Sequence, residues 1–219
     1  ALAKKIGKVP VLSGVCFGFI ANRIMSQRGK QADELVLEGP TPEEIDKAVY
    51  DYGFAMGPFQ MIDLVGLDVI GRDETERSVR GDLVKMDRLG QKKNGGYYDY
   101  DEDRKATPSP VAAAAIADFA SFKGVANKGK LSDEDIVARL LYPVVNEGAK
   151  VLEEGIAIRA SDVDIAAILG YNWPVYTGGP MFWGDTVGLQ KVVDGLQAMG
   201  IEPSRLLVEK AAKGESFTR

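Results

Sequence analysis

This chain lacks the side chain that most often does acid–base chemistry in enzymes. The sequence has no histidine, which removes the commonest general base and the commonest zinc ligand, and which excludes a serine triad built on histidine. With Cys16 as its one cysteine, the chain is not expected to bind zinc and cannot form an intrachain disulfide. Catalysis by this chain would therefore have to use other side chains.

Asn22 is the first candidate, because it stands at the expected start of a helix. A neutral amide can hold a substrate oxygen and a catalytic imidazole without competing for the proton. From spacing alone, an asparagine at a helix start is more often a cap. Both interpretations of Asn22 stay open at the level of spacing.

Two kinds of charged residue occur twice at matching places, namely Arg23 with Arg139 and Asp63 with Asp185. Paired carboxylates can do acid–base work, but each aspartate stands where we expect a helix to begin, so we predict that both cap helices. For the two arginines we predict structural roles, either in ion pairs or at helix C-terminal carbonyls.

The composition is that of a globular protein with a core, at 45% hydrophobic and 27% charged residues. A net charge of −5 and a pI near 5.0 give no reason to expect nucleic acid as a partner. No apolar run approaches the roughly 20 residues that span a bilayer, and no signal peptide opens the chain. We therefore expect a cytoplasmic protein without a membrane span.

Most of the chain has helical periodicity. The exception is residues 8–13, which we expect to form a short strand left over from the sheet of a missing upstream domain. Thr41, Pro42 and Glu44 form the pattern of a capping box. Residues 90–110, rich in glycine, tyrosine and proline, are predicted to be a long connection.

The two halves of the chain follow one plan. Ile20-x-x-Arg23 matches Ile136-x-x-Arg139, and Gly57-Pro58-x4-Asp63 matches Gly179-Pro180-x4-Asp185. Duplicated helical units usually bury a shared apolar face. We therefore predict an all-α fold of two tandem related helical units packed with pseudo-two-fold symmetry. The predicted domains are residues 1–17 (the end of an upstream domain and the junction), 18–122 (first repeat) and 123–219 (second repeat).

Four segments carry a family resemblance: residues 18–23, 56–68, 95–100 and 176–180. In this order they resemble the C-terminal helical domains of 3-hydroxyacyl-CoA dehydrogenases, as found in the multifunctional fatty-acid oxidation enzymes. One departure is Val15-Cys16-Phe17, where the family usually has an aspartate and a proline.

The resemblance implies a C-terminal fragment of an enzyme that oxidises (S)-3-hydroxyacyl-CoA to 3-ketoacyl-CoA and passes the hydride to NAD. In that family the catalytic histidine, and the glutamate that orients it, belong to the nucleotide-binding domain. We expect that domain upstream of Ala1 and expect NAD to bind there. This fragment is then expected to bind no cofactor and no metal and to be inactive alone. The resemblance also implies that Asn22 lies near the substrate's 3-oxygen. Met56, Gly57, Pro58 and Phe59 are candidates to line the acyl pocket or face the missing domain, although plain packing explains them equally well.

The expected partners are the acyl-CoA substrate, the chain's own N-terminal nucleotide-binding domain and further copies in a homo-oligomer. Other functions remain open at this level. The chain can be a purely structural dimerisation or scaffold module, the helical domain of a related hydroxy-acid dehydrogenase, or an autonomous acyl-CoA binding module.

Overall fold

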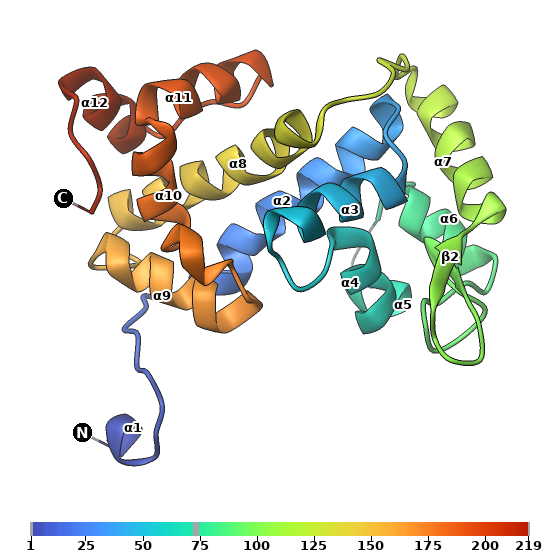
Figure 1. Ribbon diagram of the computed structural model, residues 1–219, viewed down its shortest axis with the longest axis horizontal. Helices are drawn as coiled ribbons and strands as arrows, with labels where there is room; N and C mark the ends of the chain where they lie inside the picture. The colour runs from blue at the N-terminus through green and yellow to red at the C-terminus, as the bar shows by residue number, and fades with distance from the viewer. Residues whose placement is uncertain (1, 72–74, 219) are drawn as a thin grey trace. The chain divides into compact units, whose positions relative to one another are not determined.

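The computed structural model describes residues 2–71 and 75–218, and it divides the chain into two compact units (Figure 1). Unit 1 combines Ala1–Gln31 with Ala138–Arg219, and unit 2 is the continuous stretch Ala32–Val137. This grouping by compactness differs from the predicted repeats, whose boundaries remain a prediction.

Unit 2 is mainly helical. Its elements are η1 (Val36–Glu38), α3 (Pro42–Tyr52), α4 (Pro58–Val65), α5 (Leu67–Ile70), α6 (Val79–Lys85), β1 (Tyr98–Tyr100), β2 (Ala106–Pro108) and α7 (Pro110–Lys123).

The helices of unit 1 come from both ends of the sequence. They are α1 (Leu2–Lys5), α9 (Ala160–Tyr171), η2 (Val175–Thr177), α10 (Pro180–Val187), α11 (Leu189–Ala198) and α12 (Arg205–Lys213). Two long helices, α2 (Ala21–Leu35) and α8 (Asp133–Glu153), have residues in both units. The prediction of an all-α fold is confirmed.

The predicted N-terminal strand is wrong. Residues 8–14 follow α1 as irregular chain, and Gly14 joins them to the rest of unit 1 by donating its N–H to the Ile156 carbonyl at 2.8 Å. A strand needs a neighbouring strand to satisfy its backbone groups, and the described residues provide none here. Its apolar side chains stay exposed, with Val9 at 61% and Leu12 at 71%.

The start of α3 is confirmed as predicted. Glu44 N–H donates to Thr41 Oγ1 at 3.2 Å, Thr41 N–H donates back to Glu44 Oε2 at 3.1 Å, and Pro42 takes the first helical position. α8 contains Pro143 and begins after Ser132, whose hydroxyl accepts from Asp135 N–H.

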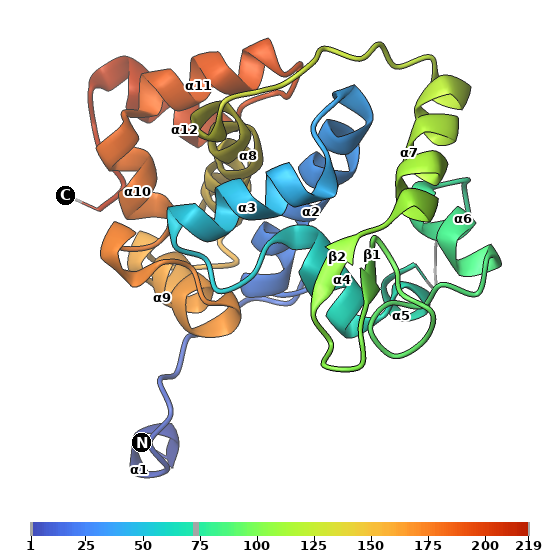
Figure 2. The same cartoon turned by 45° about the vertical axis from the view of Figure 1, so that its right-hand side comes forward.

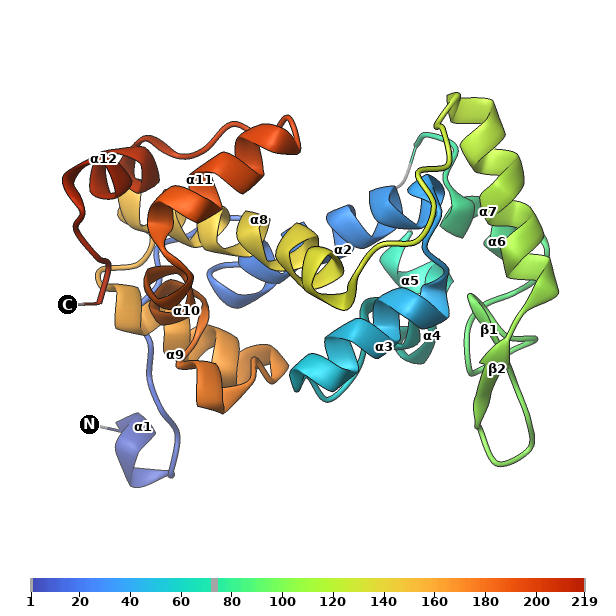
Figure 3. The same ribbon diagram turned by 45° about the horizontal axis from the view of Figure 1, so that its top comes forward.

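The connection over residues 90–110 is more ordered than its composition indicated. It contains the antiparallel hairpin β1–β2, which runs directly into α7 (Figure 3). The buried guanidinium of Arg88 organises it by donating to the carbonyls of Gly96 and Tyr98 and to the Asp99 carboxylate. The Arg88 guanidinium thus supplies hydrogen-bond donors that a further strand would supply in a larger sheet.

The duplicated plan is visible in the order of the elements. In unit 2, α3 is followed by α4 and α5, and in unit 1, α9 is followed by α10 and α11 (Figure 1). Gly66 and Gly188 stand at the same break, with φ angles of 105° and 99° that favour glycine. Each copy therefore turns between its second and third helix in the same way.

Candidate functional site

The junction before α2 is a tight turn that requires glycine at position 18. Gly18 and Phe19 have φ angles of 66° and 51°, and a Cβ on Gly18 would lie 2.8 Å from Arg23 N and 2.9 Å from Asn22 Cβ. Cys16 Sγ lies 3.1 Å from the Phe19 carbonyl oxygen, and Asn22 N–H donates to the Gly18 carbonyl at 3.2 Å. The turn places Asn22 in the first turn of α2.

The Asn22 side chain is exposed. Among the described residues, none forms a hydrogen bond with its amide, so Asn22 does not cap the helix. Capping was the structural interpretation of this residue. Its amide remains available to a group outside the described chain.

Arg23 holds this part of α2 firmly to α8. Its Nε donates to Glu147 at 2.7 Å, and its two terminal nitrogens donate to Glu154 at 2.6 and 2.7 Å. These bonds, the Glu154 bond above all, raise the pKa of the Arg23 guanidinium above its usual value. The predicted structural role of Arg23 is confirmed, and it fixes the backbone next to Asn22.

Arg139 makes the symmetry-related contact, since its Nε donates to Gln31 Oε1 at 3.1 Å. The offset along the chain from Arg23 to Arg139 equals the offset from Gln31 to Glu147. Each long helix therefore contributes an arginine to the other at the same position, as pseudo-two-fold symmetry requires.

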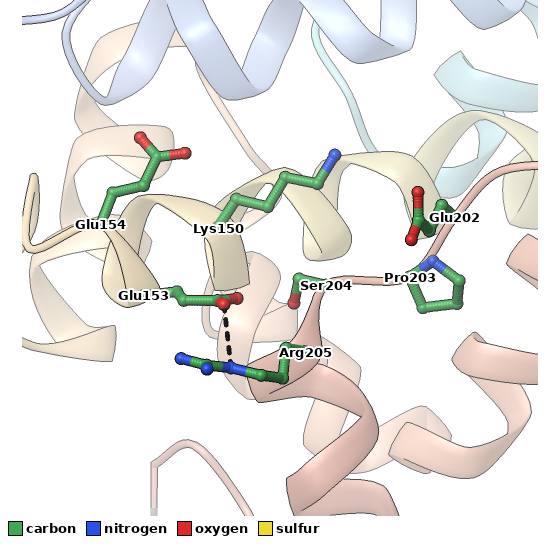
Figure 4. A pocket seen from close by; sticks show the side chains of 7 residues that line it. All are labelled: Lys150, Glu153, Glu154, Glu202, Pro203, Ser204 and Arg205. Atoms are coloured by element: carbon green, nitrogen blue, oxygen red, sulfur yellow. Dashed lines mark ion pairs between the residues drawn. The ribbon is translucent and has the colours of Figure 1, made fainter.

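Glu154 also lines a small hollow of about 300 Å³ in unit 1 (Figure 4). Figure 4 shows that Arg205 forms an ion pair with Glu153, at 3.3 Å, across this hollow. The remaining lining residues are Lys150, Glu202, Pro203 and Ser204. Two of its lining residues already have structural roles, since Glu154 accepts from Arg23 and Ser204 caps α12. We therefore assign a structural role to this hollow.

Large apolar side chains surround the junction and stay exposed in unit 1. Val15 is 90% exposed, Phe17 84% and Phe19 57%. Isolated apolar residues on a surface are normal, but a contiguous run of them indicates a surface that another body covers.

The other candidate residues, 56–59, lie in unit 2, where they begin α4. The Asp46 carboxylate, from α3, accepts from Phe59 N–H at 2.9 Å and from Gln60 N–H at 2.8 Å. A Cβ on Gly57 would lie 2.3 Å from this carboxylate, so the close approach requires glycine. Asp46 thus caps α4, although it belongs to the neighbouring helix α3.

The side chains of this segment differ in exposure. Phe59 is fully buried and packs against the Tyr97 ring, with 4.6 Å between the ring centroids. Gly57 and Pro58 are buried too, and Met56 is half-buried. Their contact with substrate remains a prediction.

The duplicated aspartates do not begin helices, so this prediction is wrong. Asp63 and Asp185 lie inside α4 and α10, because those helices start at Pro58 and Pro180. Each carboxylate instead accepts two successive backbone N–H groups from a segment that returns to the helix much later in the chain. The pairs are Tyr97 and Tyr98 for Asp63, and Phe217 and Thr218 for Asp185.

Two of the buried carboxylates have shifted acidities. Burial raises the pKa of Asp63, against the lowering effect of the two backbone hydrogen bonds. Burial raises the pKa of Asp164 to about 7, with the backbone bond from Met181 opposing and the charge of Asp185 adding to the shift. Both are tied to backbone groups, which is a structural role.

The described residues do not fit a dinucleotide or a metal ion. Their strands, β1 and β2, are short and antiparallel, whereas a dinucleotide site needs a strand, a glycine-rich turn and a helix. Within residues 2–71 and 75–218, no group of three ligating side chains comes together. In the same residues, no helix has the length and hydropathy to cross a membrane.

The family model for the C-terminal domain of 3-hydroxyacyl-CoA dehydrogenase matches residues 18–100 and 136–215. The chain belongs to this family. One domain description matches two separate stretches, which is what a duplicated dehydrogenase C-terminal domain gives. The resemblance that the sequence indicated is confirmed.

Relatives of this dehydrogenase domain are multifunctional proteins. The peroxisomal bifunctional enzymes of Danio rerio and Homo sapiens are 36% and 34% identical, over 98% and 97% of this chain and 34% of each relative. A peroxisomal fatty acid beta-oxidation multifunctional protein of Arabidopsis thaliana is 37% identical, over 97% of this chain and 32% of the relative. The chain thus spans about a third of the length of these proteins.

Two solved structures are also similar to this chain. The dehydrogenase part of multifunctional enzyme 1 from C. elegans has a TM-score of 0.72 and 31% identity, over 94% of this chain and 50% of that one. The 3-hydroxybutyryl-CoA dehydrogenase of Escherichia coli K12 shares the fold, with a TM-score of 0.68 and 24% identity, over 97% of this chain and 63% of that one.

The expectation of a cytoplasmic protein is wrong. The relatives from Danio rerio, Homo sapiens and Arabidopsis thaliana are peroxisomal proteins, and a relative from Cucumis sativus, 35% identical, is glyoxysomal. A low cysteine count and a moderate negative charge suit several reducing compartments, so composition could not distinguish between them.

Proposed function

We propose that this chain forms the helical part of an NAD-dependent (S)-3-hydroxyacyl-CoA dehydrogenase of fatty-acid β-oxidation, in which it completes the substrate cleft. The observation that carries the proposal is the exposed amide of Asn22, which is without a hydrogen-bond partner among the described residues. The Arg23 ion pairs hold its helix in place, as a binding group requires. Membership of the dehydrogenase family supports the reaction type.

The division of labour follows from the side chains that this chain has. When NAD is bound to the nucleotide-binding domain of the parent enzyme, it supplies the hydride acceptor. The proton acceptor is a histidine of that same domain, as the family resemblance implies, since this chain has none. Asn22 donates its Nδ2–H to the substrate's 3-oxygen, so that it holds this oxygen beside the imidazole without exchanging a proton.

The nucleotide-binding domain is the proposed partner for the exposed apolar surface of the junction. Val15, Phe17 and Phe19 lie within seven residues of Asn22 in sequence, and covering them brings the partner's groups close to the amide. We assign the assembly of homo-oligomers to other faces of the helical units.

Residues 56–59 contribute in two ways. Gly57, Pro58 and Phe59 position α4, and the half-buried Met56 is the member of this segment that we assign to the acyl group. Met56→Ala should raise KM for long acyl substrates and leave kcat near its original value, because it removes ground-state binding. A fall in thermal stability without a change in KM would show a packing role alone.

The first test compares two proteins: this chain alone, and the chain with its upstream region restored. NADH formation from 3-hydroxybutyryl-CoA is expected only in the restored protein. Activity in the chain alone would show a histidine-free mechanism and would refute the proposed division of labour.

The second test separates the dehydrogenase proposal from a purely structural scaffold. In the restored protein, Asn22→Ala should lower kcat about a hundredfold, the loss typical of removing one hydrogen-bond donor at a developing charge. Gln27→Ala, on the same helix, is the matched control and should leave kcat unchanged. If Asn22→Ala lowered only stability, the chain would be a scaffold module.

A further inference from the structure

Unit 2 contains a pocket beside α7, which we call the α7 pocket. It is bounded by residues 36–43 on one side and by α7 on the other, and α7 contacts η1. Figure 2 shows that α7 follows directly after the hairpin β1–β2. Its volume of about 660 Å³ lies within the range of roughly 300 to 1,000 Å³ that is typical of small-molecule sites. Neither the junction at Asn22 nor residues 56–59 belong to it.

The walls of the α7 pocket are apolar. Val36, Leu37 and Ile116 line it with aliphatic side chains, and α7 contributes small alanines that leave room beside the helix. Four prolines are also among the lining residues: Pro40, Pro42, Pro108 and Pro110. Because proline has no N–H, the backbone of this pocket offers few donors to a ligand.

Three of the polar side chains that line the pocket already have hydrogen-bond partners. Thr41 belongs to the capping box of α3. Ser109 Oγ donates to Asp99 and accepts from Arg88. The Asn127 carbonyl oxygen accepts from Gly129 N–H at 2.7 Å.

The charge of the lining residues also favours an apolar ligand. Of the described residues that line the pocket, Glu43 carries a charge and none is a cation. A carboxylate or phosphate would meet no counter-charge here, and bringing it in would cost its hydration. An uncharged apolar group is the ligand that this lining can bind.

From these observations we propose that the α7 pocket binds the hydrocarbon chain of a fatty acyl group, whose polar end stays in solvent at the mouth. The exposed Ala113 and Ala117 form the α7 side of the pocket, where a larger side chain would fill the space. The lining identifies an apolar ligand, whereas the choice of a fatty acyl chain rests on the proposed function, and the test below measures binding without turnover.

A second hollow on α7 provides the contrast. It has a similar volume, about 690 Å³, and Ala114 belongs to its lining. Four of its nine described lining residues are charged, namely Arg77, Asp82, Lys85 and Asp118. Hydrocarbon should therefore bind on the Ala117 side of α7 and not on the Ala114 side.

The test is calorimetric titration of this chain with hexanoate, octanoate and decanoate, each below its micelle concentration. Binding should tighten about fourfold for each added methylene, the effect of burying one CH₂ group. Decanol should bind within a few-fold of decanoate, because the pocket holds the chain and not the head group. Equal affinities along the series, or decanoate binding far tighter than decanol, would overturn the proposal.

Two substitutions on one helix locate the site. Ala117→Phe should abolish decanoate binding, whereas Ala114→Phe, an equally exposed position facing the charged hollow, should leave it unchanged. Ala113→Leu, a smaller change on the pocket side, should weaken binding at least tenfold and keeps the test decisive if Ala117→Phe fails to fold. If all three variants bound decanoate like the original chain, the pocket would not be the site.

Discussion

At the scale of single residues, buried carboxylates tied to backbone N–H groups decide much of this structure. Asp46 and Asp164 hold the starts of α4 and α10 from the preceding helices, through Phe59 N–H and Met181 N–H respectively. Asp46 also accepts from the Tyr98 hydroxyl at 2.9 Å. The counterpart of Tyr98 in the second copy is Thr218, whose shorter side chain bonds to Asp185 instead.

The raised pKa of Asp164 predicts a pH dependence of stability. In an unfolded chain an aspartate has a pKa of about 3.9, and in the folded chain Asp164 has a pKa of about 7. Between these values the folded chain keeps a proton that the unfolded chain releases, so the free energy of unfolding falls as the pH rises. Relative to Asp164→Asn, the original chain should lose about 1 to 3 kcal/mol between about pH 5 and 8. Urea unfolding at several pH values, followed by tryptophan fluorescence, measures this, and parallel curves for the two proteins would contradict it.

Gly57 gives a second prediction at this scale. Gly57→Ala would place a Cβ within 2.3 Å of the Asp46 carboxylate, and such overpacking should cost about 1 to 3 kcal/mol. Gly29→Ala is the control, because a Cβ there meets nothing within 4 Å and alanine favours a helix interior. The control should raise the midpoint of urea unfolding slightly. A larger loss for Gly29→Ala than for Gly57→Ala would show that the close approach is not the constraint.

At the scale of elements, each copy is closed by a late segment that returns to a carboxylate. In unit 2 this segment is the start of β1, and in unit 1 it is the chain that follows α12. The sequence showed the two aspartates at equivalent positions, but it could not show their partners. Those partners lie more than thirty residues away, and they are backbone amides, which any sequence provides.

Asp185→Ala should therefore release the C-terminal segment. The change leaves Phe217 N–H and Thr218 N–H without an acceptor and should cost about 1 to 3 kcal/mol. Carboxypeptidase should then remove the last residues faster than from the original chain, as mass spectrometry would show. Asp185→Asn, which keeps an oxygen acceptor, serves as the control. Equal cleavage of Asp185→Ala and the original chain would mean that other contacts hold this segment.

The sequence predicted most elements that rest on local chemistry. The helix start at Thr41, which has its own capping residue, lies where it was expected. The predicted N-terminal strand failed because apolar alternation does not supply a neighbouring strand. The starts of α4 and α10 were misplaced. The carboxylates that bind their first N–H groups, Asp46 and Asp164, belong to other helices and are distant in sequence. The α7 pocket escaped the sequence analysis because prolines and alanines from separate elements have to come together to make it.

At the scale of the whole molecule, the two tryptophans provide a selective probe. Trp173 and Trp183 are the only tryptophans in the sequence, and both lie buried in unit 1. Fluorescence therefore reports the unfolding of unit 1, whereas circular dichroism reports helices of both units.

Gly57→Ala weakens unit 2, so it should separate these two signals. We expect the helical signal to begin to fall at a lower urea concentration than the fluorescence signal, because non-coincident transitions indicate separate unfolding. The original chain, measured by both probes, is the reference. If the two transitions moved together in Gly57→Ala, the units would unfold as one cooperative block.

Unit 1 is built from the two ends of the sequence, with all of unit 2 between them. On the ribosome, the first 31 residues emerge long before their partners in residues 138–219 exist. At about 5 to 20 residues per second, this delay lasts on the order of ten seconds. During that time Ile20 and Ile24, which are buried in the finished protein, are accessible to a chaperone or a protease. The order of synthesis thus exposes the segment around Asn22 to cellular quality control before the protein can protect it.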